Sequence, residues 1–182
     1  MLHSSLYGKV IHLEPNTLHI CMTMLLAQPG LFHWSLYMVD TNGIATRYHW
    51  TTDVARASRD LPYEHFQYYT VNPVMEINDT LNQNLAFIRL DAYQLKPDTT
   101  PESFALHIQG IFETSYNNVR QNREAKISCR TWLLAALQKL RQVGYLALTS
   151  EEVCSLERKA INIAKEVEDN IAESITVKVT SI

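Results

Sequence analysis

The sequence contains no long hydrophobic run. Its longest apolar stretch, residues 18–27, is interrupted by His19 and Thr23 and is shorter than the roughly 18 residues that a membrane-spanning helix needs. The first residues, Met1 to Ser4, lack the charged-then-apolar order of a secretory signal peptide. We therefore expect no membrane span and a cytoplasmic location.

Cysteine is also scarce, with Cys21, Cys129 and Cys154 the only three in 182 residues. An odd number without a C-x-x-C spacing disfavours both a disulfide framework and a structural zinc site. The histidines that show no metal-ligand spacing on a helix are His12, His19, His65 and His107. We expect free thiols, no metal site and no cofactor, and we interpret Cys21 and Cys154 as packing residues.

Basic clusters and glycine-rich motifs are missing as well. Lys and Arg number 16 against 19 Asp and Glu, and no basic run occurs, so nucleic acid is not an expected partner. The absence of G-x-G-x-x-G, of a P-loop and of G-x-S-x-G disfavours the common nucleotide sites and the serine hydrolases. The composition, 46% hydrophobic and 19% charged, is typical of one compact soluble domain.

Strand-like segments precede helix-like segments, and this order favours the α+β class, an antiparallel sheet packed with helices. Strands are predicted at 9–13, 18–26, 32–39, 44–50, 66–77 with a break at Pro73, and 85–95, with a loop or short helix at 51–66 and a turn at 78–84. Helices are predicted from Pro101 behind the cap Thr100, from Ser128 to about Val143, and over 150–173 with Ser150 as cap, with a polar loop at 117–127. A predicted edge strand at 174–180 completes an extension, 149–182, of a domain that covers 1–148.

A hairpin is predicted around Asn42-Gly43, the strongest short turn signal in the sequence. A two-residue loop pairs His49 with Leu36, and His33 and His49 then point to opposite faces. A three-residue loop with Gly43 in a bulge instead pairs His49 with Ser35. That register, which we favour, puts four polar side chains on one face, namely His33, Tyr37, Arg47 and His49.

Cys129 and His33 are the residues most able to carry chemistry. Ser128 is a good N-cap, so Cys129 should lie in the first turn of a helix, where unpaired N–H groups and the helix dipole lower a thiol pKa. Arg130 adds nearby positive charge. His33 can serve as the base for such a thiol. Alternatively, Cys129 only packs and His33 is a half-exposed strand residue bound to backbone.

Two segments resemble known signatures. Residues 32–37 (FHWSLY) and 128–133 (SCRTWL) resemble the HWS and GCRFW motifs of a family of uncharacterised fungal proteins, and the match runs over about 9–148. More distantly, a strand His-Trp that precedes a helix-opening Cys resembles the circularly permuted papain-like group, which includes lecithin:retinol acyltransferase-like proteins and the PPPDE peptidases. The segment SCRTW departs from the Asn-Cys-Glu-His-Phe box of those acyltransferases.

The resemblance implies a permuted papain-like fold in which Cys129 is the nucleophile, His33 is the base and His49 orients His33. We therefore expect a cysteine-dependent acyl-transfer enzyme, a hydrolase or transferase that acts on an amide, thioester or ester of a small molecule, in fungal small-molecule metabolism. The expected substrate-binding residues are Trp34, Ser35, Tyr37, Arg47, Trp50 and Arg130.

Two other functions stay open on the same fold. The first is a non-catalytic protein that binds an apolar ligand. Its pocket would be lined by Trp34, Trp50, Tyr68 and Tyr69. The second is a homo-oligomer that pairs through the last helix or through the exposed edge strand.

Overall fold

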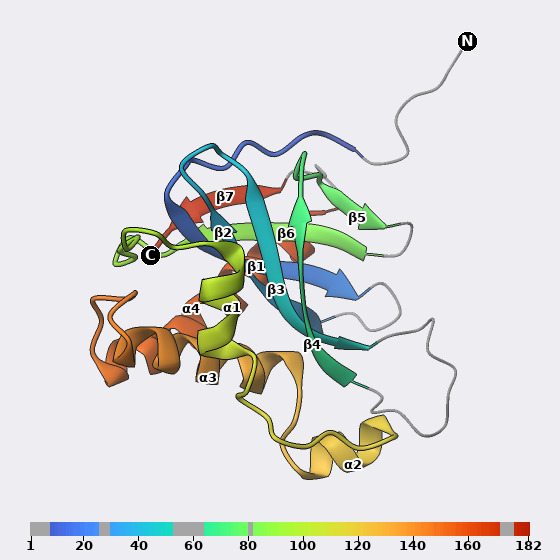
Figure 1. The fold of residues 1–182 in the computed structure, drawn as a ribbon. Coiled ribbons are helices and arrows are strands. Elements are labelled where there is room, and N and C mark those ends of the chain that lie inside the picture. Colours follow the sequence, from blue (N-terminus) through green and yellow to red (C-terminus); the bar gives the residue numbers. More distant parts are fainter. Residues whose placement is uncertain (1–7, 26–29, 53–63, 80–81, 172–176) are drawn as a thin grey trace.

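The computed structural model describes residues 8–25, 30–52, 64–79, 82–171 and 177–182 (Figure 1). Its strands are β1 Thr17–Leu25, β2 Phe32–Val39, β3 Ala45–Thr52, β4 Glu64–Val71, β5 Ile77–Asp79, β6 Asn82–Arg89 and β7 Lys178–Ser181. Its helices are α1 Pro101–Ile108, α2 Val119–Glu124, α3 Cys129–Gln142 and α4 Ser150–Asp169.

The strands form one sheet in the order β4-β3-β2-β1-β6-β5, and β7 also pairs with β6. Strand β7 runs parallel to β6, whereas the other described pairs are antiparallel. Figure 1 shows the sheet strongly twisted, with β3 and β4 crossing in front of β6, and with α2 apart from the other helices. The α+β class is therefore confirmed, with a mostly antiparallel sheet packed with helices and with β7 as an edge strand. The permuted papain-like arrangement stays a prediction.

The hairpin between β2 and β3 has the bulged register. Ser35 lies opposite His49, and Tyr37 lies opposite Arg47. Gly43 closes the loop with a φ of 79°, a backbone conformation that glycine adopts without strain. The side chain of Asp40 accepts hydrogen bonds from the backbone N–H groups of Asn42 and Ile44, both at 2.8 Å. The loop chemistry therefore fixes which side chains of β2 and β3 share a face.

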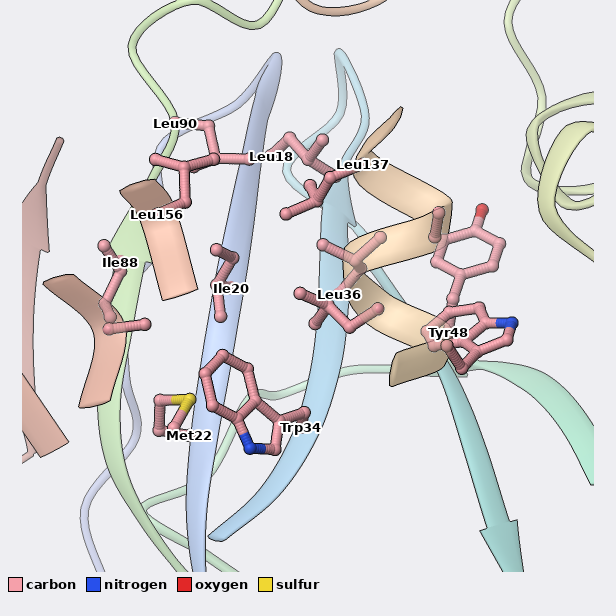
Figure 2. Close-up of a cluster of buried hydrophobic side chains, with 14 of the residues drawn as sticks. Leu18, Ile20, Met22, Trp34, Leu36, Tyr48, Ile88, Leu90, Leu137 and Leu156 are labelled. Atoms are coloured by element: carbon pink, nitrogen blue, oxygen red, sulfur yellow. The ribbon is translucent and has the colours of Figure 1, made fainter. Parts of the chain in front are cut away.

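One face of the sheet packs against α1, α3 and α4. Figure 2 shows Leu18, Ile20 and Met22 of β1 beside Trp34 and Leu36 of β2, with side chains of α3 and α4 among them. The opposite face, which we call the helix-free face, carries a second buried cluster that includes Cys21, Tyr37, Val39, Ala45 and Phe87. The prediction of a half-buried strand at 32–39 is therefore wrong, because both faces of β2 are covered.

Capping residues begin the helices at or close to the predicted positions. Thr100 caps α1 and Ser128 caps α3, as predicted, whereas α4 is capped by Thr149 and not by Ser150. The Thr149 side chain accepts from the backbone N–H of Glu152, whose carboxylate in turn accepts from the backbone N–H of Thr149. The apolar stripe of α4 is buried in the chain's own core through Val153, Leu156, Ala160 and Ala164. None of the helices in the described ranges is long and apolar enough to cross a lipid bilayer.

Polar segments were the main source of wrong boundaries. The predicted turn at 78–84 mostly belongs to β5 and β6, since a polar residue such as Asn84 is satisfied across the sheet by Thr23 (2.9 Å) and by the carbonyl of Met75 (2.9 Å). The predicted strand at 85–95 ends at Arg89, and 9–13 makes only an isolated bridge through Val10. Most of the predicted segment 51–66 and the start of 174–180 lie outside the described residues.

Candidate active site

The thiol of Cys129 lies against the backbone on both sides of His33. Ser128 caps α3 by accepting a hydrogen bond from the backbone N–H of Thr131 at 3.2 Å, so the helix begins at Cys129. The Sγ atom of Cys129 is 4.0 Å from the carbonyl oxygen of Phe32, and the backbone of Trp34 also forms a hydrogen bond with it. The helix start is therefore placed next to the first residues of β2.

The backbone of β2 is open at this point because β2 and β3 separate there. Their ladder ends at Ser35 opposite His49, whereas β2 begins at Phe32 and β3 stays paired with β4 as far as Thr52. The carbonyl of Leu31 accepts a hydrogen bond from Leu25 of β1, and successive residues of a strand point their backbone N–H and C=O groups to alternate sides. The even-numbered residues of β2 therefore direct these groups toward β3. Cys129 thus meets peptide groups that β3 leaves without a strand partner.

Burial raises the pKa of the Cys129 thiol. Backbone hydrogen bonds from Trp34 and Arg130 and the charge of Arg123 oppose this effect, while the charge of Glu64 adds to it. The prediction of a lowered thiol pKa is therefore wrong, because desolvation outweighs the helix terminus. The Arg130 side chain is turned toward α4, where it pairs with Glu157.

His33, which is half-buried, and His49, which is buried, form an imidazole pair on the helix-free face. Nε2 of His33 is 2.9 Å from Nδ1 of His49, and the two rings meet edge to face. Burial, with the charge of Arg47, lowers the pKa of His33 to about 3. Burial also lowers the pKa of His49, again with a contribution from Arg47. Both rings are therefore neutral at neutral pH, and one donates to the other.

The structure brings His33 to His49 but does not join His33 to Cys129 by a hydrogen bond in the part of the chain that it describes. His33 projects from the helix-free face, whereas Cys129 opens a helix on the other face. The thiol nevertheless contacts the backbone of the residues on either side of His33. The catalytic roles of Cys129, His33 and His49 stay predictions.

The predicted substrate-binding residues are divided by the sheet. Ser35, Tyr37 and Arg47 share the helix-free face with the two histidines. Trp34 and Trp50 are instead buried in the core against the helices. The proposed apolar pocket is not assembled either, because Tyr68 stacks on Tyr48 while the hydroxyl of Tyr69 binds Arg47 on the opposite face.

Sequence reasoning missed three residues close to the thiol. Glu64 at the start of β4 accepts from both Arg123 and Asn122 of α2, and the charges of Glu64 and Arg123 act on Cys129. The prediction of a polar loop at 117–127 is wrong, because α2 lies within it. The available signal was Asn118, whose side chain caps α2 by accepting from the backbone N–H of Gln121.

The remaining cysteines differ from each other. Cys21 is buried, as predicted, and its Sγ lies 3.3 Å from Oδ1 of Asn84 on the helix-free face. Cys154 is exposed on α4, so its interpretation as a packing residue is wrong. The helical spacing placed it near the apolar stripe, but it projects past the edge of that stripe.

No group of three or more His, Cys, Asp or Glu side chains in the described segments could hold a metal ion. No family model matches the chain, and neither a curated protein nor a solved structure does so. We therefore infer function from the geometry of this chain alone.

Proposed function

We propose that the chain is a cysteine-dependent acyl-transfer enzyme, a hydrolase or transferase acting on an amide, thioester or ester. Cys129 is the nucleophile, His33 the base and His49 the residue that orients His33. One observation carries this proposal. The Cys129 thiol contacts the backbone that flanks His33, while the far nitrogen of that imidazole is held by His49.

The histidine pair supports a defined direction of proton transfer. Because His49 occupies Nε2 of His33, Nδ1 is the nitrogen left to accept a proton. Sγ of Cys129 attacks the substrate carbonyl, and its proton passes to Nδ1 by way of water at the open start of β2, because the thiol and the imidazole lie on opposite faces of the sheet. N–H groups in the first turn of α3 stabilise the oxyanion. The leaving group departs with that proton, and an acyl thioester remains on Cys129.

The second half of the reaction reverses these roles. Water or another acceptor attacks the thioester while His33 takes a proton from it, and the proton returns to the thiolate as the acyl group leaves. Water makes the enzyme a hydrolase, and an alcohol, thiol or amine makes it a transferase.

The test uses p-nitrophenyl acetate as an activated ester in a Cys154→Ser background, because the exposed Cys154 thiol would otherwise react nonspecifically. We expect an acetyl adduct on Cys129 by peptide mass spectrometry and a release of p-nitrophenol that Cys129→Ser abolishes. His33→Ala should slow acylation by about 10²-fold or more, the usual contribution of a general base. His49→Ala should slow it less, since His49 only orients His33.

His107→Ala is the matched control, because His107 packs on Tyr145 away from the imidazole pair. The proposal is abandoned if Cys129→Ser acylates as fast as its parent, or if His33→Ala behaves like His107→Ala. Circular dichroism of each variant separates a lost active site from a lost fold.

A further inference from the structure

The helix-free face contains a buried arginine without a carboxylate partner. Arg47 is 6% exposed, and in the described part of the chain no Asp or Glu pairs with it. Its Nη1 donates to the hydroxyl of Tyr69 at 3.1 Å, and its guanidinium lies 5.9 Å from the centre of the Tyr37 ring. A guanidinium stays charged even when buried, and a buried charge is costly unless an opposite charge meets it.

Two buried donors in this cluster have no partner among the described residues. They are Nε of Arg47 and Nε2 of His49, which is 5% exposed. When Nε2 of His33 donates to Nδ1 of His49, Nε2 of His49 carries the hydrogen. Arg47 and His49 are two positions apart on one strand, so their Cα atoms are about 6–7 Å apart. Both point to the same face, and in this tautomer both nitrogens are hydrogen-bond donors.

We propose that Arg47 and His49 bind the carboxylate of a small-molecule ligand on the helix-free face. A carboxylate has two acceptor oxygens, which suit a guanidinium edge together with an adjacent N–H donor. It also supplies the negative charge that this cluster lacks. The hydroxyls of Tyr37 and Tyr69 flank the position, one opposite Arg47 on each neighbouring strand.

Tyr69, whose hydroxyl holds Arg47, is an exposed side chain on the outer strand β4, so a movement of Tyr69 would open Arg47 to a ligand. The next pair on this face, Ala45 opposite Val71, lines a cavity of about 160 Å³ beside residues 10–13. A ligand whose carboxylate binds Arg47 can therefore extend its remaining atoms toward that cavity or toward His33. Only the second direction makes it a substrate, and that assignment rests on the proposed function.

The experiment titrates the wild-type protein with sodium acetate against sodium chloride at equal ionic strength. Long-range ¹H–¹⁵N correlation spectra report each histidine ring. We expect acetate to shift the His33 and His49 resonances in a saturable way, to leave His107 unchanged, and to raise the thermal midpoint saturably. Arg47→Gln should weaken acetate binding at least 10-fold. Arg120→Gln, which changes an exposed arginine, should leave it unaffected.

If Arg47→Gln does not fold, Arg47→Lys replaces it, because lysine keeps the charge but not the forked edge, and it should also weaken binding. An unchanged His49 resonance throughout the wild-type titration would mean that these donors bind water only, and would overturn the proposal. The readout involves no chemistry at Cys129, so loss of acetate binding and loss of acylation are separate results.

Discussion

Arg123 and Glu64 attach α2 to the start of β4. We predict that removing the charge of Arg123 lowers the free energy of unfolding more than removing the charge of Glu64. Two nitrogens of Arg123 meet the two carboxylate oxygens of Glu64 at 2.8 and 2.7 Å. Asn122 donates a third hydrogen bond to Glu64 at 2.9 Å. The Glu64 side chain is 5% exposed, whereas that of Arg123 is 46% exposed. Glu64 therefore needs Arg123 to compensate its buried charge, whereas water can solvate Arg123 when Glu64 is removed.

Arg123→Met leaves a buried carboxylate with the Asn122 amide as its remaining described donor. Breaking a buried ion pair from one side costs about 3–5 kcal/mol, and the solvent around Arg123 puts this case near about 3 kcal/mol. Glu64→Gln leaves a guanidinium that water can solvate and that still donates to the carbonyl of Ile127 at 2.6 Å. Its cost should be about 1–2 kcal/mol, the range for altered hydrogen bonds to a charged group.

Urea denaturation followed by tryptophan fluorescence measures both free energies of unfolding. Arg120→Met is the matched control, because this neighbour on α2 is 89% exposed and its described partner is Glu124 on the same helix. The free energy of unfolding of this variant should decrease by less than about 0.5 kcal/mol. Equal losses for Arg123→Met and Glu64→Gln, or a larger loss for Glu64→Gln, would refute the reasoning from burial.

Three further predictions concern the core, the thiols and the histidines. Trp132→Ala should cost about 3–5 kcal/mol in urea denaturation, and Trp132→Phe less, about 1–3 kcal/mol, because the phenylalanine keeps one aromatic ring but leaves a small cavity and the carbonyl of Ile108 without its indole donor. Equal losses for the two variants would show that the aromatic ring does not carry the packing. Iodoacetamide should label Cys154 first because it is exposed, then Cys129, and Cys21 last, because burial raises the pKa of the last two thiols and Cys21 is the more buried of them. Early labelling of Cys21 would count against its burial. Between pH 6.5 and 4 the unfolded chain binds protons that the folded chain does not, because the folded pKa values are lowered. As the pH is lowered from 6.5 to 4, the free energy of unfolding should therefore decrease by up to about 1.4 kcal/mol per pH unit for each of His19 and His33. A free energy that stays constant over this range would contradict the lowered pKa values of these two histidines.

The hairpin was predictable because turn chemistry and side-chain alternation act over a few residues. Asn42-Gly43 indicated the turn, and Gly43 in a bulge gave the register that puts Ser35 opposite His49. The start of α3 was predictable for the same reason, since Ser128 satisfies helix N–H groups within its own first turn.

Features that depend on distant partners were not predictable. Helix α2 has no apolar stripe, and it is held by the contact of Arg123 with a strand 59 residues earlier. The second buried face of the sheet has the same origin, because Val74 and Val177 pack on it from far along the chain. The charge states at the candidate site follow from this burial and not from the local motifs.

The two ionisable groups of the candidate site are shifted in ways that favour the same resting state. Burial raises the pKa of the Cys129 thiol and lowers that of His33, so the thiol and the imidazole are both neutral. The charge of Arg47 is the second cause of the low His33 pKa. A carboxylate bound to Arg47 would offset that charge and raise the pKa of His33. His33 would then be a stronger base with ligand bound than without it, and the site would avoid a permanently reactive thiolate.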